Sequence, residues 1–136
     1  MVVPKSPQQM LSEIIAFHGH GGPWAALGYR AGLLARATLE PREMHGISAI
    51  VTLKYERPYS CFLDGLQLAS GCTIGKKNLT FKPDGGEPVA VFHAADRTLR
   101  IAIQPAVLTN ITPPDDGKTM WVLRQKDDAL FITGRA

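Results

Sequence analysis

The sequence predicts an α+β fold, with helices packed on a mostly antiparallel sheet, in a single domain that spans residues 1–136. Two observations indicate this class. Apolar residues recur at helical spacing over residues 6–39 and 59–70, whereas alternating, β-branched segments fill residues 46–56 and 79–105. The chain is also long enough for one hydrophobic core, and its 45% apolar and 20% charged residues are typical of a globular domain.

Two helices are predicted at the start of the chain. Ser6-Pro7 suits an N-cap followed by proline at the first helical position, and predicts a helix over residues 6–16. A second helix begins at Pro23 and runs to about residue 39, where Pro41 ends it. Between them, three glycines within residues 18–22 predict a tight turn.

The rest of the chain alternates between the two kinds of element. We expect a strand over residues 46–56, a helix over 59–70 with Gly71 as its C-cap, and a loop over 72–78. Three consecutive strands should follow and form an antiparallel meander, with a helix and a closing strand after them. Their predicted ranges are 79–82, 88–94 and 98–105 for the strands of the meander, 118–128 for the helix and 130–133 for the last strand.

Charge and hydropathy exclude several classes of protein. The net charge of +3 comes from 15 basic and 12 acidic residues that are scattered along the chain, so we expect no nucleic-acid partner. No apolar stretch approaches the roughly 20 residues that span a bilayer, and the N-terminus does not resemble a signal peptide. We therefore expect a cytoplasmic protein without membrane association, in which Cys61 and Cys72 are thiols, ligands or core residues rather than a disulfide.

His18 and His20 are candidate metal ligands. Residues two apart diverge in a regular helix, but a glycine-rich turn can aim both imidazoles at one ion. His-x-His alone is a weak signal, and surface or core histidines are the alternative. The helix that separates Cys61 from Cys72 is roughly 15 Å long, so both thiols cannot bind one ion within a single copy. A buried apolar role is the alternative for each cysteine.

Asp64 and Lys76 are further candidates. Asp64 lies three residues after Cys61, on about the same helical face, where it could orient a ligating histidine or form a surface salt bridge. Lys76, in the loop over 72–78, could bind an anionic ligand or belong to a solvated turn. Neither a P-loop nor a serine nucleophile elbow is present.

Two longer motifs resemble those of the FmdE family, which takes its name from formylmethanofuran dehydrogenase. The first is Phe17-His18-Gly19-His20, then Pro23 and Leu27-Gly28-Tyr29-Arg30-Ala31. The second is Cys61-Phe62-Leu63-Asp64-Gly65-Leu66-Gln67 with Gly71-Cys72-Thr73-Ile74-Gly75-Lys76-Lys77-Asn78-Leu79. The resemblance covers most of the chain, as a short form without the cysteine-rich C-terminal zinc ribbon of longer members.

The resemblance implies a metal site and an intimate homodimer. The ligands carried over are His18, His20, Cys61 and Cys72, with a divalent transition metal as cofactor, zinc first and iron or nickel as alternatives. Asp64 and Lys76 are carried over as residues that would line the site. Trp24, which the family pattern does not have, could cover a bound cofactor or simply pack in the core. The implied partners are a second copy of the chain, a small-molecule or anionic ligand, and a molybdenum or tungsten enzyme.

One departure from the family pattern falls within the first motif. Family members have cysteine immediately before the proline, where this chain has Gly22, and glycine after it, where this chain has Trp24. The missing thiolate makes the site richer in histidine and could leave an open coordination position.

Three functions follow from these observations. The first is a metal- or metallocofactor-binding protein linked to redox or one-carbon metabolism, in which any metal chemistry would be Lewis-acid catalysis or water activation. The second is a non-catalytic accessory or metal-carrier module. The third is a thiol-redox protein that uses Cys61 and Cys72.

Overall fold

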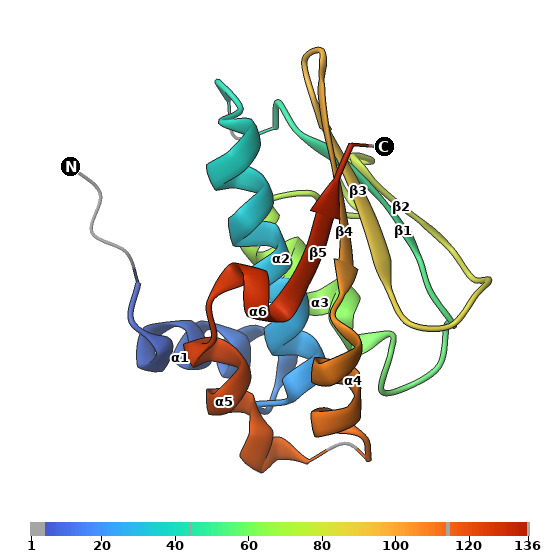
Figure 1. The fold of residues 1–136 in the computed structure, drawn as a ribbon. Helices are drawn as coiled ribbons and strands as arrows, with labels where there is room; N and C mark the ends of the chain where they lie inside the picture. Colours follow the sequence, from blue (N-terminus) through green and yellow to red (C-terminus); the bar gives the residue numbers. More distant parts are fainter. Residues whose placement is uncertain (1–4, 44, 114, 136) are drawn as a thin grey trace.

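The computed structural model describes residues 5–43, 45–113 and 115–135, and Figure 1 shows a helical layer on one face of a five-stranded sheet. The α+β class is therefore confirmed. The helices are α1 (Pro7–His18), α2 (Pro23–Leu39), α3 (Cys61–Ser70), α4 (Pro105–Ile111), η1 (Asp116–Lys118), α5 (Thr119–Arg124) and α6 (Asp127–Leu130). The strands are β1 (Ser48–Thr52), β2 (Leu79–Lys82), β3 (Val89–Ala94), β4 (Arg97–Ile103) and β5 (Phe131–Gly134).

The strand order is β2-β1-β3-β4-β5, which corrects the predicted meander. β1 lies between β2 and β3, and it pairs with β2 in parallel, with Ala49 opposite Leu79. The other pairs are antiparallel. Parallel neighbours need a crossover, and here the crossover contains α3. The prediction was wrong for β2 and β3, which are consecutive in the chain but are separated in the sheet by β1.

The region after β4 also differs from the prediction. The strand predicted to reach residue 105 ends at Ile103, and Pro105 instead begins α4. The single helix predicted over 118–128 is divided into α5 and α6. Arg30, a buried residue of α2, explains the division because its guanidinium donates hydrogen bonds to the carbonyl oxygens of Val122 and Leu123, which end α5. It also pairs with the Asp127 carboxylate at 3.0 Å, where α6 begins.

Glycines bring α2 and α3 into backbone contact. A Cβ atom added at Gly65 would lie 1.8 Å from the carbonyl oxygen of Ala25, and one at Gly28 would lie 1.9 Å from that of Phe62. Gly32 lies one turn further along the same contact, where an added Cβ would be 2.8 Å from the Ser70 nitrogen. This close packing at Gly28 and Gly32 fixes the first turn of α3 beside the start of α2.

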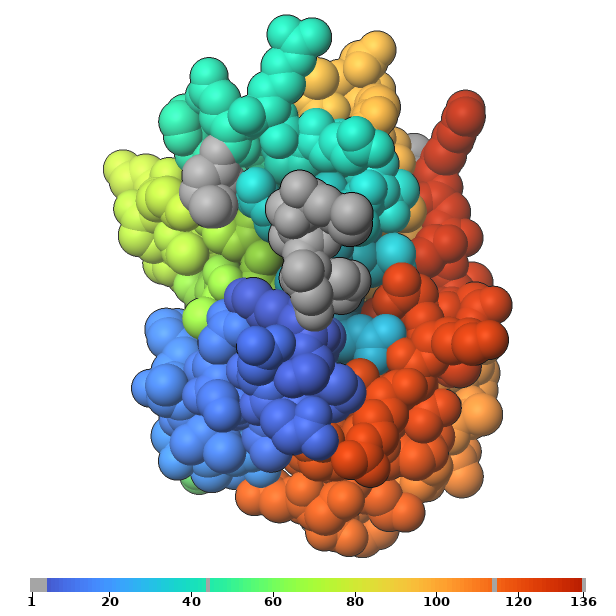
Figure 2. Space-filling view, turned by 90° about the vertical axis from the view of Figure 1, so that its left-hand side faces the viewer, coloured from blue at the N-terminus to red at the C-terminus, as the bar shows by residue number. Residues whose placement is uncertain are grey.

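α1 and α5 also belong to the helical layer, where both contact α2. Figure 2 shows α1, in blue, beside the orange-red C-terminal helices, and the two segments are in contact. α1 is fixed at its N-terminus by a capping box between Ser6 and Gln9. None of the helices in the described residues is long and apolar enough to cross a membrane.

Candidate functional site

The turn between α1 and α2 places two histidines beside one another. α1 continues to His18, two residues beyond its predicted end, and Gly19 ends it with a φ of 96° and an N–H that donates to the Ile15 carbonyl. Gly22 is then the N-cap of α2. The predicted tight turn is confirmed, and it brings the ring centroids of His18 and His20 to 4.8 Å.

His18 is held by a carboxylate of α3. Its Nδ1 lies 2.6 Å from Oδ2 of Asp64, and its side chain is only 10% exposed. Its Nε2 is buried and has no hydrogen-bond partner among the described residues. When Nδ1–H donates to a carboxylate, a neutral imidazole has its lone pair on Nε2. This is the arrangement by which proteins orient metal-binding histidines.

His20 also has a carboxylate partner, and the sequence does not reveal which residue it is. Its Nδ1 lies 3.1 Å from Oδ2 of Asp116, in η1, and 3.3 Å from the carbonyl oxygen of Gly21. Both side chains of this pair are largely exposed. Asp116 is 96 residues from His20, and the only local signal in the sequence is a turn-forming Asp115-Asp116-Gly117. Each histidine of the turn thus has one ring nitrogen bound to an aspartate.

The two cysteines lie at opposite ends of α3. Cys61 is half-buried and lines the same cavities as His18, and burial together with the nearby Asp64 charge raises the pKa of its thiol. Cys72 is 0% exposed, with its Sγ 3.6 Å from the carbonyl oxygen of Ile47, and burial raises the pKa of its thiol as well. The structure brings Cys61 to the histidines and places Cys72 away from them.

The loop over residues 71–78 is built by its own hydrogen bonds. The Asn78 side chain accepts from Thr73 N–H at 2.8 Å and donates to the Ile47 carbonyl oxygen at 3.1 Å. The Lys76 N–H donates to Oγ1 of Thr73, and Lys76 itself is exposed. Lys76 lines neither cavity at the histidines, whereas Ile74 of the same loop lines the larger one.

Two cavities adjoin the histidines. The smaller has a volume of about 60 Å³ and the larger about 300 Å³, and both are lined by His18 and Cys61. Trp24 lines the smaller one, and its ring packs against that of Tyr59 in a T-shaped pair. Trp24 Nε1 is buried without a partner among the described residues. The smaller is lined by His18, His20, Gly22, Pro23, Trp24, Ala25, Pro58, Cys61 and Asp116. The larger is lined by His18, Tyr55, Arg57, Ser60, Cys61, Leu63, Asp64, Gln67, Ile74, Leu79 and Phe81.

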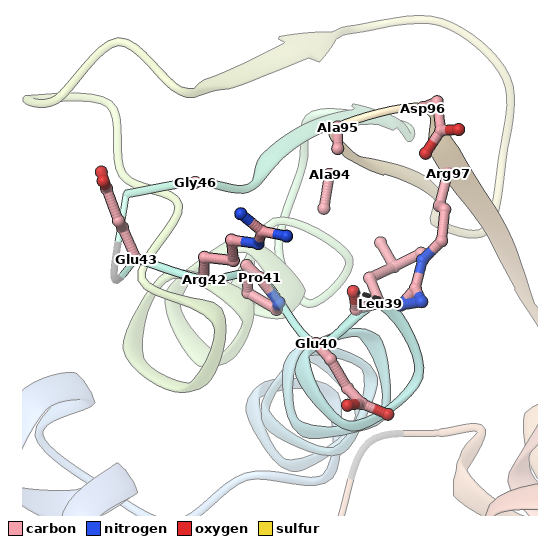
Figure 3. A pocket seen from close by; sticks show the side chains of 10 residues that line it. All are labelled: Leu39, Glu40, Pro41, Arg42, Glu43, Gly46, Ala94, Ala95, Asp96 and Arg97. Carbon is pink, nitrogen blue, oxygen red and sulfur yellow. Dashed lines mark hydrogen bonds between the residues drawn. The ribbon is translucent and has the colours of Figure 1, made fainter.

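A third hollow, of about 520 Å³, lies elsewhere, between the end of α2 and the β3–β4 turn. Figure 3 shows its charged side chains, among them Arg42, Asp96 and Arg97. Arg97 donates hydrogen bonds to the carbonyl oxygens of Thr38 and Leu39, which terminate α2. None of the site residues predicted from the sequence is among those that line this hollow.

The histidine pair falls short of a complete metal centre within one chain. Over residues 5–43, 45–113 and 115–135, no group of three or more His, Cys, Asp or Glu side chains lies close enough together to hold a metal ion. The donors that line the smaller cavity are the two imidazoles, the Cys61 thiol and the Asp116 carboxylate.

Comparison with known proteins gives a family and a curated relative. Residues 17–128 match the family described as FmdE, Molybdenum formylmethanofuran dehydrogenase operon. A protein from Archaeoglobus fulgidus named "Probable S-adenosyl-L-methionine-binding protein" is 31% identical over 101 residues, which cover 67% of this chain and 26% of that protein. This chain therefore matches about a quarter of the length of that relative.

Proposed function

The chain belongs to the FmdE family, and on that premise we propose that it binds a divalent transition metal ion at His18 and His20, in a role linked to formylmethanofuran dehydrogenase. The observation that carries the proposal is the buried Nε2 of His18, which has no partner among the described residues and whose ring is bound to Asp64 through Nδ1. Buried polar atoms without a partner are rare in folded proteins. A metal ion at Nε2 would supply that partner.

The donor set fits zinc best, with iron or nickel as alternatives. Imidazole nitrogen suits all three metals, and a cysteine thiolate favours zinc and iron. His18 and His20 would hold the ion through Nε2, because each Nδ1 is bound to an aspartate. Cys61 lines the same cavity as both histidines, and its thiol would have to lose a proton on binding. A bound metal would supply Lewis-acid chemistry.

Cobalt substitution tests this ligand set. Co²⁺ added to the metal-free protein should give a visible spectrum that saturates at one equivalent and disappears in His18→Ala and His20→Ala. A near-ultraviolet thiolate-to-cobalt band should be lost in Cys61→Ser and retained in Cys72→Ser, which serves as the matched control. A spectrum that survives both histidine substitutions would refute the proposal.

A homodimer would complete the coordination. The expectation of a dimer is supported by large apolar side chains on the exposed face of α1, where Ile15 is 44% and Phe17 is 54% exposed, directly before His18. A second copy could then contribute a ligand that one chain lacks. Light scattering with and without one equivalent of zinc measures the mass, which should be twice that of the chain in the presence of metal. A mass of one chain at micromolar concentration with zinc bound would contradict this.

Binding of S-adenosyl-L-methionine in the larger cavity is a second candidate function. The name of the Archaeoglobus relative raises it, and the cavity supports it because Tyr55 and Phe81 form an aromatic pair with centroids 4.7 Å apart. An adenine ring stacks on such side chains, and a sulfonium cation is attracted by aromatic faces and by the Asp64 carboxylate. Equilibrium dialysis should show binding that Tyr55→Ala weakens and Ile132→Ala, on the distant β5, does not. Absence of binding by the wild type would exclude this function.

The accessory or carrier role is compatible with the same metal site, since it needs no acid–base pair. The thiol-redox hypothesis receives less support. A disulfide requires two Cα atoms within about 7 Å, whereas Cys61 and Cys72 lie at opposite ends of the ten-residue α3. Both pKa values are raised, which disfavours the reactive thiolate.

A further inference from the structure

The larger of the two cavities at the histidines is lined by an apolar group and a polar group of side chains. The apolar group comes from the edge strand β2, from the segment after β1 and from the loop over 71–78, and contains Tyr55, Ile74, Leu79 and Phe81. The polar group comes from α3 and the turn before it, and contains Arg57, Ser60, Asp64 and Gln67. The volume of about 300 Å³ is at the lower end of the range for small-molecule sites in proteins. Such a lining is suited to an amphipathic ligand.

Two large apolar side chains of this cavity are exposed. Tyr55 is 57% and Ile74 is 50% exposed, and both line the same cavity rather than being scattered singly over the surface. The ring centroids of Tyr55 and Phe81 are 4.7 Å apart, with 33° between the ring planes. A planar ring of a ligand would stack against this pair and cover apolar surface that is otherwise in water.

Arg57 is the cation of the polar group. Its side chain is exposed and forms no hydrogen bond or ion pair with another described residue. The N-terminus of α3, at Cys61, lies at the same cavity, and the positive end of a helix dipole favours an anionic group. The N–H groups of residues 61–63 are bonded to carbonyl oxygens of residues 58–60, so the guanidinium is the charged donor that a ligand would meet. A guanidinium binds a carboxylate through two parallel hydrogen bonds.

Gln67 and Asp64 add a donor and a negative charge. Gln67 Oε1 accepts a hydrogen bond from the Ile74 N–H at 3.1 Å, which leaves the Nε2 amide as a further donor. Asp64 accepts from His18 through Oδ2, and its side chain is 41% exposed. With histidine counted as neutral, Arg57 and Asp64 give the lining one formal charge of each sign. A simple anion would be repelled by Asp64 and a simple cation by Arg57, whereas a zwitterion is attracted by both.

We propose that the larger cavity binds a zwitterionic amino-acid derivative that carries a planar ring. In this arrangement the ring stacks on Tyr55 and Phe81, the carboxylate pairs with Arg57, and the cationic group faces Asp64. The proposal rests on the second candidate function above, a ligand in the larger cavity, and adds the residue that selects for a carboxylate. It requires no metal ion at the histidines.

Two ligands and two proteins form a thermodynamic cycle that tests the role of Arg57. The ligands are S-adenosyl-L-methionine and its decarboxylated analogue, which keeps the adenine ring and both cationic groups and lacks the carboxylate. Arg57→Met should weaken binding of S-adenosyl-L-methionine about tenfold or more in equilibrium dialysis, and should not weaken binding of the analogue. Arg100→Met removes an exposed arginine of β4 that lines neither cavity at the histidines, so this matched control should change neither affinity.

The comparison of the two ligands on the wild type needs no variant. The wild type should bind the decarboxylated analogue about tenfold more weakly, so the role of the carboxylate is tested even if Arg57→Met does not fold. Equal binding of both ligands by the wild type, or an equal loss of both in Arg57→Met, would overturn the assignment of Arg57 and leave the second candidate function standing. Absence of binding of either ligand by the wild type would refute the second candidate function and the assignment together.

Discussion

Asp64 Oδ2 lies 2.6 Å from His18 Nδ1, and this hydrogen bond joins α3 to the last residue of α1 across 46 positions of the chain. The glycine contact between α2 and α3 determines where Asp64 lies, and the α1–α2 turn determines where His18 lies. The orientation of the His18 ring therefore depends on three helices.

The first prediction concerns this carboxylate. Asp64→Ala should weaken zinc affinity roughly 10–100-fold, because the ring of His18 loses the partner that holds it. Asp64→Asn should have a smaller effect, since an amide oxygen still accepts from Nδ1–H. Competition with a chromophoric chelator measures both. Asp84→Ala, in an exposed loop, is the control, and an equal loss in that variant would show that the effect is not specific.

The second prediction concerns the glycine contact. Gly65→Ala should lower the free energy of unfolding by about 3 kcal/mol or more, because its Cβ would overlap the backbone oxygen of Ala25 and the helices would have to separate. Urea denaturation measures this. Gly75→Ala should change stability by less than about 0.5 kcal/mol, because nothing lies near its Cβ position. A stable Gly65→Ala protein would contradict the described contact.

The third prediction is a loss of stability at alkaline pH. The pKa of the Cys72 thiol is raised in the folded protein, chiefly by burial, so the unfolded chain loses this proton first. The resulting stability is fully present below the ordinary thiol pKa of roughly 8.5 and declines as the pH rises toward the higher folded value. Urea denaturation between about pH 7.5 and 9.5 should show this decline, and Cys72→Ala should reduce its slope. A wild-type slope that Cys72→Ala leaves unchanged would assign the decline to other groups.

Local signals in the sequence predict much of this fold. The bounds of α2 follow from Pro23 at its start and Pro41 after its end, and β2 has its predicted bounds because its residues alternate between turn-forming segments. The strand order cannot be predicted from these local signals, because it depends on which strands pair after the crossover that contains α3. The sequence does not predict α4, because a seven-residue segment with two buried positions is too short to show a helical periodicity.

The site is predictable to a similar extent. Local sequence patterns predict the turn with its two histidines, and they predict Cys61 and Asp64 on one face of a helix. The structure places these four residues together. The separation of Cys72 from Cys61 follows from the helical rise alone. Asp116 could not be predicted, because its contact with His20 joins positions 96 residues apart and only the packing of α5 against α1 brings them together.

The central claim is that His18 and His20 bind one metal ion, and metal analysis of matched double variants tests it most directly. His18→Ala/His20→Ala is compared with His45→Ala/His93→Ala, which removes the other two histidines of the chain. After loading with zinc and removal of excess, the wild type and the control should each retain one equivalent per site, and the His18/His20 variant should retain none while keeping its circular dichroism spectrum. Full metal content in the folded His18/His20 variant would contradict the claim.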